Sequence, residues 1–190
     1  MERRELLKMI ALLTGGVMIG GNALLTGCSP ENGKMKSKLV FSPQDIDFLD
    51  EVADTILPAT KSPGAKAAKV GSWMTVMVND CYEEKDQKIF KEGIDQLNQA
   101  CEKMYGTAFM KASTVQRLSL LTAMDKEAKE YQSKKNHDAL PAHYFTMMKQ
   151  LTLLGYFTSE IGCTKALRYI AVPGRFQGTV PYKKGDKAWA

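Results

Sequence analysis

The sequence predicts an all-α protein, an irregular bundle of about five to six helices with a turn-rich C-terminal tail. Apolar residues recur at spacings of three and four over most of the region from residue 43 to residue 154. Two capping boxes, at Ser42 and Ser113, mark helix starts. The sequence shows no convincing run of alternating residues that would indicate strands, and no internal repeat. These observations together favour helices packed on helices.

The first helix is expected directly after Ser42. This serine is the N-cap, Pro43 suits the first helical position, and Asp45 completes the capping box. One face of the helix then carries Ile46, Leu49, Val52, Ala53 and Ile56. Pro58 ends the helix, because proline cannot continue the backbone hydrogen bonding. The residues from Ala59 to Gly64 form a turn-rich loop.

Two further helices are expected between residues 65 and 106. The apolar face of the first is formed by Val70, Trp73, Met74, Met77, Val78 and Cys81. The apolar face of the second is formed by Ile89, Phe90, Ile94, Leu97, Cys101 and Met104. Gly106 is expected to end the second of these helices, since glycine readily adopts the left-handed backbone of a helix C-terminus.

Ser113 and Gln116 predict the start of a fourth helix. Its inner side is expected to carry Val115, Leu118, Leu121, Thr122 and Ala128. Pro141 is expected at the first position of a fifth helix that carries Tyr144, Met148, Leu151 and Leu154. A short helix is expected at residues 164–170. Beyond Val172, turn-forming residues recur every few positions and predict an irregular tail.

Residues 1–27 are expected to be a signal peptide. A charged start is followed by an apolar stretch diluted by glycines, which is too short and too glycine-rich for a stable membrane span. The exit, Leu-Thr-Gly followed by Cys28, resembles a bacterial lipobox, so Cys28 is expected to carry lipid and to become the first mature residue. Arg3 and Arg4 resemble the twin-arginine export signal. An ordinary Sec lipoprotein signal is the alternative.

Residues 28–38 are polar and lysine-rich and are expected to form a lipid-anchored linker. Residues 39–190 are expected to form a single helical domain, since their number suits one domain. The lipid anchor predicts a location at the bacterial cell envelope, either on the periplasmic side or in the outer membrane.

Charge and cysteine content restrict the function further. The chain has 26 basic and 21 acidic residues, a net charge of +5, and the basic residues are scattered among acidic ones, so nucleic-acid binding is not expected. An exported location would allow a disulfide. Cys81 and Cys101 flank a predicted helix too long for a bridge between them, so an internal disulfide would more readily involve Cys163. Three free thiols are an equally open alternative.

The sequence predicts no catalytic, cofactor-binding or metal-binding residues. His137 and His143 are the two histidines, and neither belongs to a cluster with metal-ligand spacing. Motifs for dinucleotide, haem or nucleotide binding are missing. The 11 methionines are explained best by core packing.

Three stretches resemble a known family. They are residues 53–65, residues 153–160 and residues 172–178, which read Val-Pro-Gly-Arg-Phe-Gln-Gly. The chain is similar to gluconate 2-dehydrogenase subunit 3, the small γ subunit of membrane-associated sugar dehydrogenases. The resemblance implies a non-catalytic helical partner of a flavin-containing oxidoreductase of the glucose-methanol-choline type. It places FAD in that partner subunit and implies a cytochrome c subunit as a further partner.

The resemblance and the signal peptide predict the same role, an accessory subunit that escorts, exports or stabilises a dehydrogenase. Twin-arginine export moves folded cargo, and a flavoprotein that acquires FAD in the cytoplasm is such a cargo. The expected contact residues, chosen as irregular backbone with apolar anchors, are Pro58, Pro63, Gly64, Pro173, Gly174, Phe176 and Tyr182. Ordinary loop geometry is the alternative explanation of the prolines and glycines among them. The alternative is a free-standing envelope lipoprotein with a ligand-binding or structural role.

Overall fold

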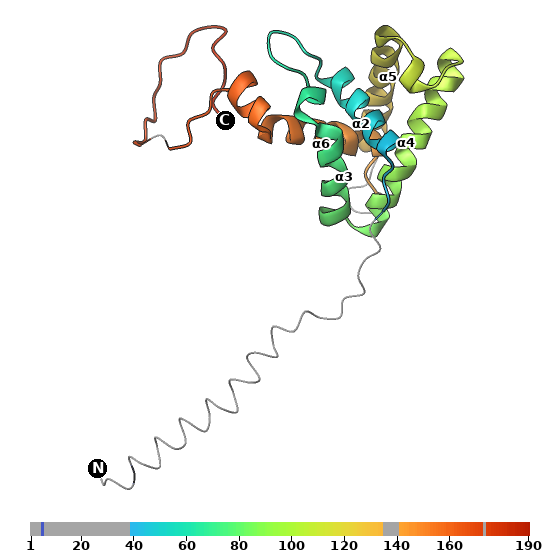
Figure 1. Ribbon diagram of the computed structural model, residues 1–190, viewed down its shortest axis with the longest axis horizontal. Helices are drawn as coiled ribbons and strands as arrows, with labels where there is room; N and C mark the ends of the chain where they lie inside the picture. Colours follow the sequence, from blue (N-terminus) through green and yellow to red (C-terminus); the bar gives the residue numbers. More distant parts are fainter. Residues whose placement is uncertain (1–4, 6–38, 135–140, 173) are drawn as a thin grey trace. The chain divides into compact units, whose positions relative to one another are not determined.

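Five α-helices, labelled as in Figure 1, carry the core of the described residues. They are α2 (Pro43–Ile56), α3 (Val70–Cys81), α4 (Glu84–Tyr105), α5 (Thr114–Ser133) and α6 (Tyr144–Thr158). The 3₁₀ helices Ala65–Ala68 and Phe109–Lys111 and the π-helix Gly162–Ala166 connect or follow them. Within the described residues no strand forms, and the one β-bridge joins Arg168 to Trp189. The all-α prediction is confirmed.

The computed structural model describes Glu5 and residues 39–134, 141–172 and 174–190. Residues 39–190 form one compact unit, and the helices above all belong to it. Several residues singled out in the sequence lie outside the described residues: Arg3, Arg4, Cys28, His137 and Pro173. No helix in the described part of the chain combines the length and the apolar character needed to cross a membrane.

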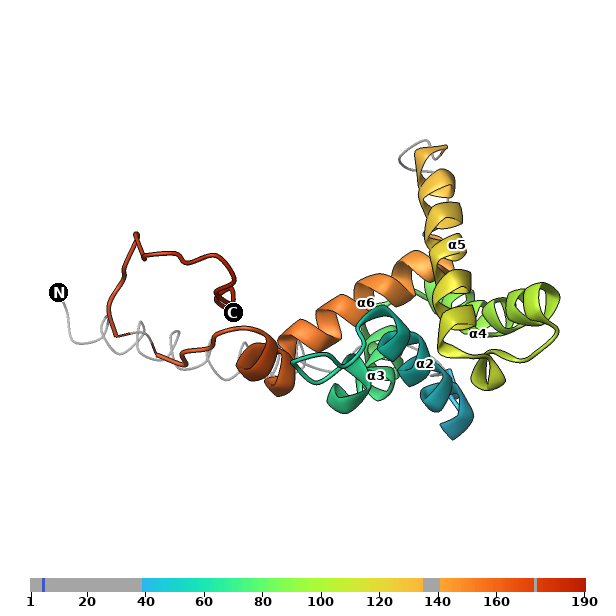
Figure 2. The ribbon, with the colours of Figure 1, turned by 90° about the horizontal axis from the view of Figure 1, so that it is seen from above.

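Helix α6 extends from the region of α4 and α5 past α2 and α3 (Figure 2). Its buried side chains include Phe145, Met148 and Leu151, each at most 2% exposed. They pack with fully buried side chains of the other helices, including Leu49 and Val52 of α2, Met74 of α3, Phe90 and Leu97 of α4, and Leu120 of α5. The core is therefore continuous across all five helices.

The predicted helix ends at the capping residues are confirmed. The Ser42 hydroxyl accepts a hydrogen bond from the Asp45 amide at 3.2 Å, and the Asp45 carboxylate accepts one from the Ser42 amide at 2.7 Å. Ser113 and Gln116 form the equivalent pair at 3.3 and 2.8 Å. Gly106 ends α4 with a φ of 67°, a left-handed conformation that glycine adopts without strain.

The inner side predicted for the fourth helix is partly wrong. Val115 and Leu118 are 77% and 56% exposed, and Thr122 is exposed too. The buried side chains of α5 are Leu120, Leu121 and Ala128. A capping box sets where a helix begins, but the packing partners set which face turns inward. In α6, Leu154 is likewise exposed rather than buried.

Three predicted helix boundaries also need correction. The segment after Gly64 is interrupted at Lys69, whose φ of 53° separates the 3₁₀ helix from α3. The fifth helix begins at Tyr144 rather than at Pro141, because His143 is the N-cap. The helix expected at residues 164–170 is instead the π-helix Gly162–Ala166.

Two glycines allow close helix contacts. A Cβ atom at Gly155 would lie 2.7 Å from the Trp73 ring, so the absence of a side chain lets α6 approach α3. A Cβ atom at Gly93 would lie 2.5 Å from the Cβ of Tyr144, where α4 meets the start of α6. The contact at Gly93 brings Tyr144, the first residue of α6, close against α4.

Candidate functional site

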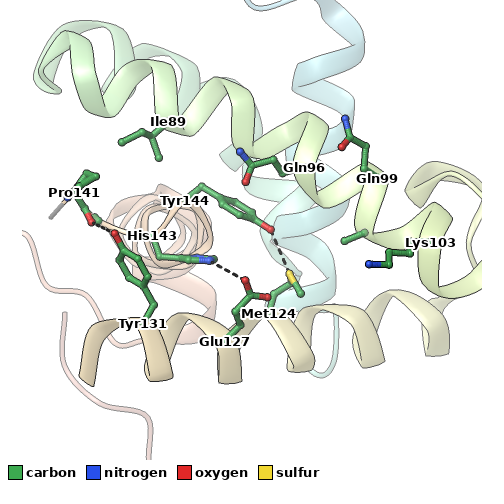
Figure 3. Close-up of a pocket in the computed structure, with 12 residues that line it drawn as sticks. Ile89, Gln96, Gln99, Lys103, Met124, Glu127, Tyr131, Pro141, His143 and Tyr144 are labelled. Carbon is green, nitrogen blue, oxygen red and sulfur yellow. Dashed lines mark hydrogen bonds and ion pairs between the residues drawn. The ribbon is translucent and has the colours of Figure 1, made fainter. Parts of the chain in front are cut away.

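A groove lies where α4, α5 and the start of α6 meet (Figure 3). We call it the α4–α5 groove. Its cavity volume is about 490 Å³, within the range of small-molecule sites. The lining residues are Ile89, Gln96, Gln99, Ala100 and Lys103 from α4, Met124, Glu127 and Tyr131 from α5, and Pro141, Ala142, His143 and Tyr144 at the start of α6.

His143 is held in one orientation at the base of the groove. Its Nδ1 accepts a hydrogen bond from the backbone amide of Phe145 at 3.2 Å, which caps α6. In the neutral imidazole the proton therefore lies on Nε2. The side chain is 10% exposed, and Nε2 lies 3.8 Å from the Glu127 carboxylate. The Nε2–H group thus faces a carboxylate across the groove at a distance beyond hydrogen bonding.

Two tyrosine rings enclose this histidine. The ring centroids of His143 and Tyr144 are 4.6 Å apart, and those of His143 and Tyr131 are 5.6 Å apart. The Tyr131 hydroxyl donates to the carbonyl oxygen of Pro141 at 3.1 Å, and the Tyr144 hydroxyl donates to the Met124 sulfur at 3.3 Å. Burial, with the nearby Glu127 charge, raises the pKa of Tyr144 to about 12. Both hydroxyls keep lone pairs that can accept hydrogen bonds.

The rim of the groove is polar and exposed. Gln96, Gln99 and Lys103 follow one face of α4, and Glu127 faces them from α5 (Figure 3). The three α4 side chains make no hydrogen bond or ion pair to any other described residue. They are therefore available for a ligand, and so is the carboxylate of Glu127, which is 60% exposed.

The C-terminal tail, residues 167–190, is a second candidate site. Its two ends are joined, since the Arg168 amide donates to the carbonyl oxygen of Ala188 and the Ala190 amide donates to that of Arg168, each at 2.8 Å. The Arg168 guanidinium lies 4.5 Å from the centre of the Trp189 ring. Lys187 donates to the carbonyl oxygen of Lys165. The tail therefore starts and ends at one place (Figure 1).

Large apolar side chains of the tail are exposed. Phe176 is 95% exposed and Tyr182 is 74% exposed. The other exposed apolar side chains in this region are Tyr169, Ile170, Val172, Val180 and Trp189. Basic residues outnumber acidic ones: Arg168, Arg175, Lys183, Lys184 and Lys187 accompany a single carboxylate, Asp186. Apolar anchors with a charged surround are typical of protein interfaces rather than of a free surface.

The predicted contact residues are divided between the tail and the loop after α2. Pro58 and Pro63 are exposed. Gly64 is buried, and a Cβ atom there would lie 2.6 Å from the Ala59 amide nitrogen, so its role is in packing the loop. Gly174 is exposed, with a φ of 72°.

The cysteines and carboxylates among the described residues form no further site. Cys81, Cys101 and Cys163 are free, and they are exposed, buried and half-buried respectively. The structure thus favours free thiols over a disulfide. In the described part of the chain, no three side chains of His, Cys, Asp or Glu come together to hold a metal ion.

The α4–α5 groove was missed in the sequence because its residues come from three separate segments. One signal was available: Gln96, Gln99 and Lys103 are spaced by three and four residues, so they share a face of a predicted helix. His143, which no sequence pattern marked as a helix cap, is the N-cap of α6.

The helices and the tail define a small all-α protein whose C-terminal tail exposes several large apolar side chains. A comparison with protein-family models finds a match to gluconate 2-dehydrogenase subunit 3 over residues 43–174. The match covers more than half of the chain, and the chain belongs to this family. The family is named as a subunit of a dehydrogenase, which implies a dehydrogenase complex as its partner. No curated protein and no solved structure matches the chain.

Proposed function

We propose that this chain is a non-catalytic small subunit that escorts, exports or stabilises a flavin-dependent dehydrogenase at the cell envelope. The dehydrogenase is of the glucose-methanol-choline type and acts on a sugar or sugar acid. It carries the FAD, and a cytochrome c subunit receives the electrons. The small subunit is held at the membrane by lipid on Cys28.

The exposed tail is the observation that carries this proposal. An isolated domain gains little from leaving a phenylalanine 95% exposed, whereas a docking subunit buries such a side chain in its partner. A stable complex needs a total buried area of at least about 1,000 Å². The apolar tail residues, together with exposed Leu154 and Phe157 at the end of α6, supply an apolar centre for such an interface.

The loop after α2 extends this surface. The Tyr156 hydroxyl of α6 binds the carbonyl oxygen of Pro63, so this loop lies beside the end of α6 from which the tail departs. Pro63 thus lies beside the last turn of α6, and Pro58 belongs to the same loop. A partner that covers Phe157 would reach both segments.

The test is co-purification of the dehydrogenase with variants of the tail. The full chain is tagged and purified in detergent from cells that contain the flavoprotein, and the flavin in the eluate is measured. We expect truncation at Val172, and separately Phe176→Ala with Tyr182→Ala, to lower the flavin yield strongly. Val115→Ala is the matched control, because Val115 is an exposed apolar residue on α5, outside this surface.

Two results would contradict the proposal. Full flavin recovery with the truncated chain would show that the tail does not dock. Complete absence of a flavoprotein from eluates of the unaltered chain would favour the second candidate, a free-standing envelope lipoprotein that binds a ligand. The α4–α5 groove is the observation that favours this second candidate, since it provides a preformed cavity with polar groups at its rim.

A further inference from the structure

We propose that the C-terminal tail, residues 167–190, docks on an acidic protein surface that its basic side chains select. The inference rests on the proposed function, because the same tail is the surface proposed to dock on the dehydrogenase. It adds the chemistry of the partner, namely carboxylate side chains around the pockets that receive Phe176 and Tyr182.

Positive charge is concentrated in the tail. Residues 39–166 contain 15 basic and 17 acidic residues, whereas residues 167–190 contain five basic residues and one acidic residue, Asp186. The Asp186 carboxylate accepts a hydrogen bond from the Lys183 amide at 3.2 Å. Figures 1 and 2 both show the tail away from helices α2 to α5, which carry most of the acidic residues. The positive charge of the tail is therefore available to another molecule.

The basic side chains lie next to the apolar anchors. Arg175 directly precedes Phe176, Lys183 and Lys184 directly follow Tyr182, and all five residues are exposed. Arg175, Lys183 and Lys184 form no ion pair with any residue that the structure describes. An apolar anchor with a charge beside it matches the apolar centre and polar rim of protein interfaces. Carboxylates at the rim of the partner's pockets would attract these charges, and basic groups there would repel them.

Arg168 lies deeper in the tail than the other basic residues. Its guanidinium is 4.5 Å from the centre of the Trp189 ring, and its buried Nε has no hydrogen-bond partner among the described residues. The hollow beside it has a volume of about 460 Å³, and Tyr182 and Asp186 also line it. A carboxylate binds a guanidinium through two parallel hydrogen bonds. An aspartate or glutamate of the partner would supply the acceptor that the tail leaves missing.

The shape of the tail favours a protein over an anionic membrane. A second hollow, of about 330 Å³, is lined by Arg175 and Phe176, and both hollows are bounded by Val180 and Trp189. Side chains on a folded partner stand at fixed separations and can fill two neighbouring hollows at once. Lipid headgroups attract basic residues through charge, but they form a fluid layer without such fixed projections.

The experiment measures how salt affects retention of the flavoprotein on the full chain. The tagged complex is immobilised in detergent and washed with NaCl from about 0.1 M to about 1 M, which shortens the screening length from about 10 Å to about 3 Å. We expect the retained flavin to fall as the salt rises. Lys183→Gln combined with Lys184→Gln should lower the retained flavin about threefold or more at the lowest salt, because two rim charges are lost. The same variant should show a weaker dependence on salt.

Two matched variants serve as controls. Lys183→Arg combined with Lys184→Arg keeps both charges and should retain flavin as the unaltered chain does. Lys85→Gln combined with Lys88→Gln removes two exposed charges from α4, outside the tail, and should also behave as the unaltered chain.

The outcomes separate this inference from the proposed function. Suppose that retention depends neither on salt nor on the paired glutamine changes at Lys183 and Lys184, yet is lost with Phe176→Ala and Tyr182→Ala. The inference is then overturned and the proposed function stands. Absence of flavin from the unaltered chain at every salt concentration would overturn both.

Two further measurements test other occupants of the tail. The Cys28→Ser chain, which cannot be acylated at this position, is mixed with phosphatidylcholine vesicles with and without phosphatidylglycerol, and its oligomeric state is measured by gel filtration. Suppose that the changes at Lys183 and Lys184 abolish binding to the anionic vesicles but leave flavin retention intact. The charges would then belong to a membrane contact, and the inference would be overturned. A dimer lost in the same variant, with flavin retention intact, would assign the tail to a second copy of the chain and likewise overturn it.

Discussion

The hydroxyl of Tyr156 donates a 2.6 Å hydrogen bond to the carbonyl oxygen of Pro63, a residue 93 positions earlier in the chain. This bond ties the loop after α2 to the last turn of α6. Tyr156 is 4% exposed, so water does not easily take the place of its hydroxyl as the hydrogen-bond donor to Pro63.

Tyr156→Phe should lower the free energy of unfolding by about 1 kcal/mol, because the ring still packs but the Pro63 carbonyl loses its donor. Urea unfolding followed by circular dichroism measures this change. Tyr182→Phe is the control, since Tyr182 is 74% exposed and its hydroxyl should contribute nothing measurable. Equal stability of the two variants would mean that this bond does not hold the loop.

Gly93→Ala should lower the free energy of unfolding by about 1–2 kcal/mol, although alanine is the better helix former. The new Cβ would lie 2.5 Å from the Cβ of Tyr144, so α4 and α6 must move apart. Glu92→Ala, an exposed change on the same helix, should stay within about 0.5 kcal/mol of the unaltered chain. A more stable Gly93→Ala variant would contradict the close approach of the two helices.

The stability of the domain should fall in acid. Burial raises the pKa of Asp45, but hydrogen bonds from Lys91 and Ser42 outweigh it and hold the pKa below its usual 3.8. A hydrogen bond from Lys66 holds the pKa of Glu51 below its usual 4.5. Hydrogen bonds from Lys129 and Lys149 likewise lower the pKa of Asp125.

A lowered pKa in the folded state means that the carboxylate adds stability above its ordinary pKa and loses it as the pH falls through the lowered value. Asp50 has the opposite effect on stability, because burial raises its pKa. It is a single carboxylate, whereas three carboxylates have a lowered pKa. We expect the free energy of unfolding to decline as the pH drops below about 4.5. Urea unfolding across this range measures the decline, and a constant stability would contradict it. Glu51→Gln should make the decline shallower.

Cys28→Ser should move the protein from the membrane fraction to the soluble fraction, because the acylated thiol is then missing. Mass spectrometry of the unaltered mature N-terminus should show lipid on Cys28. Cys81→Ser, at an exposed free thiol, should leave the membrane association as it was. A mature chain that starts elsewhere, with an unmodified thiol at Cys28, would rule out the anchor.

Arg3→Lys combined with Arg4→Lys should leave the flavoprotein in the cytoplasm. A partner without its own signal crosses the membrane only while bound to the chain that carries one. Fractionation of cells and measurement of dehydrogenase activity in each fraction provide the test. Lys8→Arg is the control, since it exchanges a basic residue of the leader that lies outside the arginine pair and keeps its positive charge. Undiminished export of active enzyme would show that this chain is not the carrier.

Capping signals in the sequence correctly predicted the starts of α2 and α5 and the end of α4, whereas Pro141 did not mark the start of α6. A serine N-cap with its partner three residues later acts through bonds within one turn, and Ser42 and Ser113 form these bonds as expected. Gly106 likewise ends α4 through its own backbone conformation, as predicted. Such features depend on neighbours in the sequence, so the sequence alone is sufficient to identify them.

Features that depend on distant residues were predicted less well. Val115 and Leu118 have the right spacing for a core stripe, but α5 turns a different face inward. Gly155 lies within α6, and only its contact with Trp73 of α3 explains why a side chain is missing there. The α4–α5 groove forms where three separate segments of the chain meet. No local sequence pattern indicates which segments of a chain lie side by side in the fold.

The joined ends of the tail have a consequence for how this protein could diversify. Because Arg168 and Trp189 hold the base of the tail together, the residues between them can be replaced without moving α6. The loop could therefore be exchanged as a cassette, by evolution or by grafting, to suit another catalytic subunit. A common helical body would then serve dehydrogenases of different surface shape.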